Sequence, residues 1–115
     1  MDIQDLDRLL PERILGKAIP HGTEFFIPYP EVLEAIDIAT KNSIAVLGVE
    51  VFQVESDGFR VQEYSHYEIP YGDDWASFVS MNNELARAFV EEHRRGEEHA
   101  YILTSTSKQE FEHLR

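Results

Sequence analysis

The chain of 115 residues has no cysteine, few cations and no long apolar run. Without cysteine it cannot form disulfides, thiolate zinc sites or a cysteine nucleophile. Only 10 lysines and arginines stand against 22 acidic residues, for a net charge of −12. This balance argues against nucleic-acid binding, which depends largely on cations that neutralise phosphates. The longest mainly apolar segment, Ile44 to Val49, is far shorter than the roughly 20 residues that span a bilayer. The first five residues are acidic and polar rather than a basic leader, so we expect a cytoplasmic protein with no membrane association.

The remaining composition is that of a folded domain. Hydrophobic residues make up 43% of the chain and aromatic residues 11%, which is enough material for a core. No repeat, low-complexity tract or linker rich in glycine, serine and proline divides the sequence. The length is typical of one domain. We therefore predict a single domain over residues 1–115.

The first quarter of the chain alternates between helical and irregular signals. Apolar residues from Ile3 to Leu15 recur at helical spacing, but Pro11 should divide this segment into two short helices, the second ending at Gly16. The segment from Lys17 to Tyr29 contains two prolines and a glycine. It is predicted to be irregular, with its Phe25-Phe26-Ile27 run packed onto the core.

The centre of the chain predicts a helix followed by a β-hairpin. Pro30 suits the first turn of a helix from about Glu31 to Lys41, with Asn42 as a left-handed cap. The β-branched run Ile44 to Val54 predicts a strand whose beginning is covered on both faces. Ser56-Asp57-Gly58 is a turn signal, and the alternating residues after it predict a second, antiparallel strand.

The last third of the chain predicts a long helix, a third strand and a short helix. The long helix has Trp75 near its beginning, Asp74 or Ser80 as its cap, and Gly96 as its stop signal. Tyr101 to Thr104 is a short strand. A serine followed three residues later by a glutamate, at positions 107 and 110, resembles the capping box of a terminal helix. The elements together predict an α+β fold, in which helices pack on a small antiparallel sheet made of the hairpin plus a third strand.

Negative charge and aromatic rings are concentrated in one region. Between Lys41 and Arg87 there are eight carboxylates and one cation, Arg60. The same 45 residues hold seven of the 13 aromatic residues. Tyrosine and tryptophan dominate interface hot spots, and surrounding carboxylates attract a cationic partner. Solubility explains the charge alone equally well, but acids and tyrosines together favour a binding surface. The predicted partner-binding residues are Glu63, Tyr64, Tyr67, Glu68, Tyr71, Asp73, Asp74 and Trp75.

Candidate catalytic and metal sites have simpler explanations. The acidic pairs Asp73-Asp74 and Glu97-Glu98 could support acid–base chemistry, but adjacent side chains rarely converge. His93 and His99 match no metal-ligand spacing. Ser65-His66 is only a sequence adjacency, since a hydrolase needs nucleophile and base in register. No glycine-rich phosphate loop is present. The sequence therefore predicts no catalytic residue, no metal and no cofactor, and a protein that is not an enzyme.

The pattern from Glu31 to Tyr101 resembles bacterial immunity proteins of polymorphic toxin systems, most closely the immunity protein 40 family. The residues that carry the resemblance, over about two-thirds of the chain, are Leu33, Ala35 and Ile36, the strand Val46-Leu47-Gly48-Val49-Glu50-Val51, Asp74-Trp75, Ala86 and Phe89.

This resemblance implies a small α+β protein that binds and neutralises one cognate toxin without catalysis. It transfers no toxin-contact residues, so the predicted surface rests on the charge and the aromatic residues. An acidic protein suits a basic toxin, such as one whose own substrate is anionic. The alternatives are an acidic regulatory module that binds another basic protein or forms a homodimer through the hairpin, and a small enzyme or small-molecule binder with a pocket near His21, His66 or Trp75.

Overall fold

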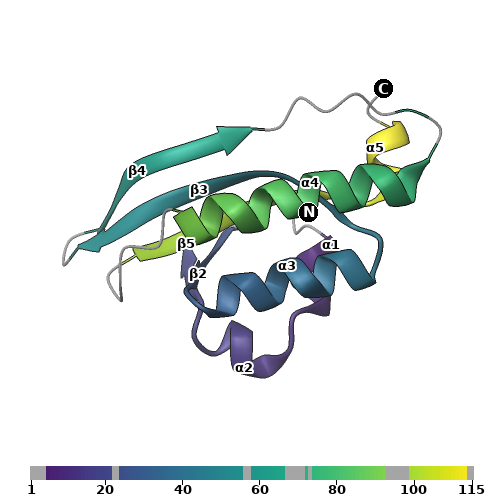
Figure 1. The fold of residues 1–115 in the computed structure, drawn as a ribbon. Helices are drawn as coiled ribbons and strands as arrows, with labels where there is room; N and C mark the ends of the chain where they lie inside the picture. Colours follow the sequence, from purple (N-terminus) through teal and green to yellow (C-terminus); the bar gives the residue numbers. More distant parts are fainter. Residues whose placement is uncertain are drawn as a thin grey trace.

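The computed structural model of the chain describes residues 5–21, 24–55, 58–66, 72, 74–92 and 99–113. The elements, in chain order, are α1 (Asp5–Leu9), α2 (Glu12–Leu15), β1 (Ile19–His21), β2 (Glu24–Pro28), α3 (Glu31–Lys41), β3 (Ala45–Glu55), β4 (Gly58–His66), α4 (Trp75–Glu92), β5 (His99–Thr106) and α5 (Lys108–His113). The strands form one antiparallel sheet in the order β1-β2-β5-β3-β4. Helices α3 and α4 pack side by side, and α4 lies along β3 (Figure 1). The predicted α+β class is confirmed.

The irregular segment predicted from Lys17 to Tyr29 is wrong, because β1 and β2 form there. The two strands pair with each other, and β2 joins β5 through Ile27 opposite Tyr101. Prolines discourage strands because they donate no ladder hydrogen bond, but short strands near a sheet edge tolerate them. Burial of Phe26 and Ile27 in separate core clusters accounts for the strand here. The sheet therefore has two more strands than the sequence predicts.

Helix α3 has its predicted bounds, but its C-terminal cap differs. Asn42 has φ −104° and is not left-handed, whereas Ser43 has φ 57°. The amide of Ile44 donates to the carbonyl of Ala39 at 2.9 Å, and that of Ser43 donates to the carbonyl of Thr40 at 3.2 Å. This is a Schellman ending with the left-handed residue one position later than predicted. This ending reverses the chain after α3 and leads directly into β3, which begins at Ala45.

The predicted hairpin is confirmed as β3 and β4. Glu55 pairs with Gly58, and residues 56 and 57 of the predicted turn lie outside the described residues. Gly58 has φ +148°, a conformation that favours glycine. The register shifts between Val51 and Phe52, as in a β-bulge. On its other side β3 pairs with β5, which is longer than the predicted third strand.

Asp74 rather than Ser80 precedes the first residue of α4, and the capping box before α5 is also present. The amide of Ser107 donates to Glu110 Oε1 at 3.0 Å, and the amide of Glu110 donates to Ser107 Oγ at 3.2 Å. The predicted stop at Gly96 lies outside the described residues.

In the part of the chain that the structure describes, no helix combines the length with the apolar composition that a membrane crossing requires.

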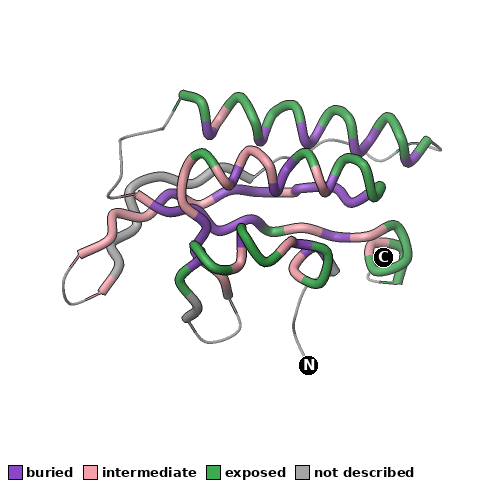
Figure 2. Tube along the Cα trace, turned by 90° about the horizontal axis from the view of Figure 1, so that it is seen from below, coloured by how far each residue is buried: buried purple, intermediate pink, exposed green. Residues whose placement is uncertain are grey.

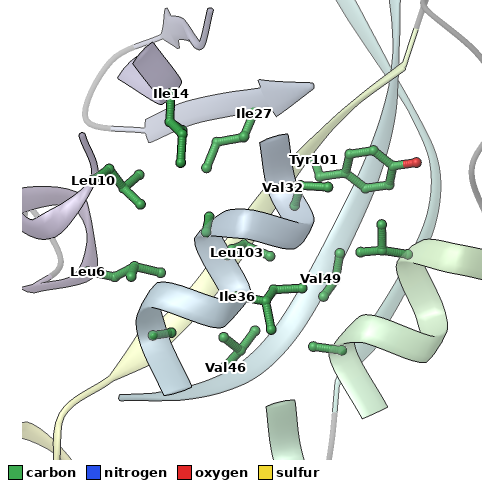
Figure 3. Packing of buried hydrophobic residues seen from close by; sticks show 14 of the residues in the cluster. Leu6, Leu10, Ile14, Ile27, Val32, Ile36, Val46, Val49, Tyr101 and Leu103 are labelled. Carbon is green, nitrogen blue, oxygen red and sulfur yellow. The ribbon is translucent and has the colours of Figure 1, made fainter. Parts of the chain in front are cut away.

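The main core fills the space between the sheet and helices α1 to α4 (Figure 3). Its largest buried side chains include Leu6, Ile14, Ile36, Val49 and Tyr101. A second cluster joins the beginnings of β3 and α4, and a third lies among β2, β5 and β3. At the beginning of β3, neighbouring residues 45 and 46 are both fully buried but belong to different clusters. This strand is therefore covered on both faces there, as predicted.

Candidate functional site: the predicted acidic and aromatic surface

The predicted binding residues fall into three groups. Tyr67, Glu68, Tyr71 and Asp73 lie outside the described residues. Glu63 and Tyr64 lie on β4, where the backbone is described. Asp74 and Trp75 lie at the beginning of α4.

Strand β4 is at the edge of the sheet. Within the described residues it pairs only with β3, with Glu63 opposite Val51 and Tyr64 opposite Glu50. Edge strands can accept a further strand from a partner. Glu50 and Val51 lie in the middle of β3, whereas Trp75 packs against Ala45, the first residue of this strand. At about 3.3 Å per residue, the five steps from Ala45 to Glu50 separate the two groups by roughly 17 Å along the strand. The structure does not bring them into one cluster.

Trp75 does not lie on an exposed surface. Its side chain is only 8% exposed and packs with Phe78 and Phe111, with ring centroids 5.2 and 5.7 Å away. The indole Nε1 donates a hydrogen bond of 2.7 Å to the carbonyl of Ser43. This bond satisfies the polar end of the ring, so that the tryptophan can be buried at little cost. The prediction of Trp75 as a contact residue is therefore corrected to a core residue.

Two other aromatic residues of the same region also serve the core. Phe78 is buried beside Trp75, and Phe52 packs edge-on against Phe26 with centroids 4.9 Å apart. Sequence reasoning could not separate these rings from contact residues, because both kinds of site favour aromatic side chains. Of the aromatic residues predicted on the surface, only the three tyrosines at positions 64, 67 and 71 remain candidates.

Asp74 is exposed and caps α4. Its Oδ1 accepts the amides of Ala76 and Ser77 at 3.1 and 3.4 Å, and its Oδ2 accepts the hydroxyl of Ser77 at 2.7 Å. The hydrogen bonds from Ser77, first from its hydroxyl and then from its amide, lower the pKa of the Asp74 carboxyl. The carboxylate is thus ionised near neutral pH, and its first role is structural.

We expect Asp74→Asn to reduce the acid sensitivity of the fold. Since folding lowers the pKa of Asp74, its contribution to stability is present above the unfolded value, near pH 4, and is lost as pH falls through the folded value. Asparagine caps helices about as well as aspartate but does not titrate. Thermal melts at pH 7 and below pH 4 should show similar stability at pH 7 and a smaller decrease for the variant in acid. Asp74→Ala, which removes the cap itself, should be less stable at both pH values; equal acid sensitivity of wild type and Asp74→Asn would contradict this role.

The carboxylates of α3 are paired within the molecule. Glu31, Glu34 and Asp37 recur every three residues along the helix, and each meets a cation from outside the helix. Lys17 Nζ lies 3.0 Å from Glu31 Oε2, Arg13 contacts Glu34, and Arg87 Nη1 lies 3.1 Å from Asp37 Oδ1. Hydrogen bonding from Arg13 lowers the pKa of Glu34. Sequence reasoning missed this row, because its cations come from two separate segments, α2 with the turn after it and α4.

Beside this row, a shallow groove of about 200 Å³ separates α3 from α4. It is lined by Ile36, Asp37, Thr40, Ser80, Asn83, Glu84 and Arg87. The side chain of Asn83 forms its floor, bound to Thr40 Oγ1 at 2.9 Å and to the backbone of β3. The groove offers hydrogen-bonding and charged groups. Among the residues that the structure describes, no three histidine, aspartate or glutamate side chains gather closely enough to hold a metal ion.

Comparison of the chain with family models, with curated proteins and with solved structures finds no match.

Proposed function

We propose that this chain is a non-catalytic immunity protein that binds and neutralises a cognate, basic toxin in the cytoplasm. The proposal combines the resemblance to the immunity protein 40 family with the distribution of charge along the chain. It requires a stable scaffold and a recognition surface, and it needs no catalytic group.

The observation that carries the proposal is the uneven distribution of lysine and arginine relative to the acidic residues. Between Lys41 and Arg87 the sequence contains eight carboxylates and only one cation. Three of the chain's 10 cations, at positions 13, 17 and 87, are engaged by the carboxylates of α3. Folding alone gives no reason to leave one region so negative, because repulsion between like charges weakens the compact state. A positively charged partner supplies that reason.

The tyrosines and acids would have different roles in the complex. Tyrosine rings bury a large area and have few rotatable bonds, so they can supply most of the affinity. Carboxylates at the rim attract a basic partner over a distance and orient it, which raises the association rate. The candidate anchors are Tyr64, Tyr67 and Tyr71, and Glu63 and Glu68 are the accompanying acids.

We expect Tyr67→Ala and Tyr71→Ala to weaken toxin neutralisation without unfolding the chain. The probe is the product of a toxin gene next to the gene for this chain, measured by growth of cells that express both and by the affinity of the purified pair. Loss of one hot-spot ring should weaken binding by about 30-fold or more. The control variants Tyr67→Phe and Tyr71→Phe keep the ring and should still protect.

The charge part of the proposal has its own readout in the same experiment. Association with the toxin should slow as salt is added, because exposed charges are screened beyond about 10 Å at 0.1 M. Full protection by the double alanine variant, together with an association rate that does not respond to salt, would rule out this surface.

A further inference from the structure

The outer side of α4 carries an exposed apolar pair. Met81 is 49% exposed and Leu85 45% exposed, and they lie one helical turn apart on the same face. In Figure 2 the long upper helix, α4, turns its exposed residues away from the sheet. Isolated exposed apolar residues are ordinary, whereas contiguous exposed apolar surface rimmed by polar residues marks interaction sites. We define the outer stripe of α4 as Ser77, Met81, Glu84, Leu85, Ala88 and Glu92, all of which are exposed.

The charge around the pair is negative. Glu84 lies beside Met81 and Leu85, and Glu92 lies at the end of the stripe. Asp74, ionised near neutral pH, lies before its beginning. The cation of this helix, Arg87, points to α3, where it contacts Asp37 at 3.1 Å and the carbonyl of Leu33 at 3.4 Å. The apolar pair is therefore bordered by carboxylates.

We propose that the outer stripe of α4 is a docking surface for a basic protein segment that places apolar side chains on Met81 and Leu85 and lysine or arginine side chains near Glu84 and Glu92. An amphipathic helix with this pattern would lie along α4, as helices do in apolar grooves and on helix faces. A second copy of the chain fits poorly, since it would bring the same carboxylates face to face. Methionine adapts its shape to different partners, which suits such a surface.

This docking proposal rests on the proposed function in one respect only, namely that the partner is the toxin. It adds a contact surface that the sequence prediction did not include. The hydrogen-bonded core below the stripe, with Asn83 bound to β3 and Trp75 bound to Ser43, holds α4 in place. The stripe is thus a rigid surface, which limits the entropy lost on binding.

The test uses the full chain, labelled with ¹⁵N, and a helical peptide of leucines on one face and lysines on the other. We expect shifts in the amide resonances of residues 77–92 and a dissociation constant at least about tenfold weaker for Met81→Ala/Leu85→Ala, which loses two apolar contacts. Leu9→Ala is the matched control, because Leu9 is 44% exposed but lies on α1. It should bind the peptide as the wild type does.

Two further peptides separate apolar docking from charge alone. A peptide with serine in place of leucine should bind α4 at least several-fold more weakly, and a peptide with glutamate in place of lysine should not bind. Equal binding by the serine peptide, unchanged affinity of the double variant, or shifts centred away from residues 77–92 would each overturn the proposal. So would sedimentation that shows a dimer which the double variant dissociates.

Toxin protection distinguishes this proposal from the proposed function. If Met81→Ala/Leu85→Ala still protects fully and the tyrosine variants do not, the α4 surface fails and the immunity function stands. If the double variant loses both peptide binding and protection while Leu9→Ala keeps both, the α4 surface is established as part of the toxin contact. Peptide docking on α4 in a chain that protects against no toxin would leave the α4 surface standing and remove the immunity function.

Discussion

Asn83→Ala should destabilise the fold by about 3 kcal/mol, because this one side chain joins three elements through buried hydrogen bonds. Asn83 Oδ1 accepts the amide of Val46 at 2.7 Å, and its Nδ2 donates to the carbonyl of Ile44 at 3.0 Å. The same Nδ2 donates to Thr40 Oγ1 at 2.9 Å. Alanine would leave the amide of Val46 and the carbonyl of Ile44 without these bonds at a buried position. Chemical denaturation of the variant measures the loss.

The neighbouring asparagine provides a matched control. Asn82 is also buried, but it donates only to the carbonyl of Phe78, one turn earlier in the same helix, at 2.8 Å. Its Oδ1 has no hydrogen-bond partner among the described residues. Asn82→Ala removes an unsatisfied oxygen and one local bond, so it should cost about 1 kcal/mol or less. Equal destabilisation by the two variants would contradict the assigned role of Asn83.

Trp75→Ala should cost roughly 3–5 kcal/mol, because it removes a large buried aromatic side chain. The indole fills the space between α4, α5 and the beginning of β3, in contact with Phe78, Phe111 and Ala45. A lower midpoint of chemical unfolding, followed by far-ultraviolet circular dichroism, would report this change. A contact residue behaves differently, since its truncation weakens binding and leaves the free protein stable.

The conservative variant Trp75→Phe separates ring packing from the hydrogen bond. Phenylalanine keeps part of the packing but cannot donate to the carbonyl of Ser43. We expect about 1–2 kcal/mol of destabilisation, between wild type and the alanine variant. If Trp75→Ala melts like the wild type yet fails to protect against a toxin, the tryptophan is a contact residue after all.

Local signals predicted much of the fold. The bounds of α3, the hairpin, the capping aspartate and the capping box all depend on residues within a few positions of one another. Strands β1 and β2 were missed because β2 pairs with β5, more than 70 residues later at Tyr101, and buries Phe26, while β1 pairs only with β2 in the described sheet. Local propensity cannot register such partners.

The predicted surface was harder to judge from sequence, for the same reason. Aromatic residues are favoured both in a core and in an interface, and only the three-dimensional arrangement shows that Trp75 and Phe78 face inward. The exposed pair Met81 and Leu85 had a signal that could have been found. They interrupt the polar side of an otherwise amphipathic helix, at a spacing of one turn.

The position of β5 in the sheet has a consequence for the order in which the protein folds during synthesis. This strand lies between β2 and β3, and it alone connects the β1-β2 pair to the β3-β4 hairpin. Until the ribosome has released residues 99–106, the growing polypeptide can form helices and two separate ribbons but cannot complete the sheet. The cooperative step therefore requires β5, and full protection of the earlier strands from hydrogen exchange should begin only when β5 inserts between β2 and β3.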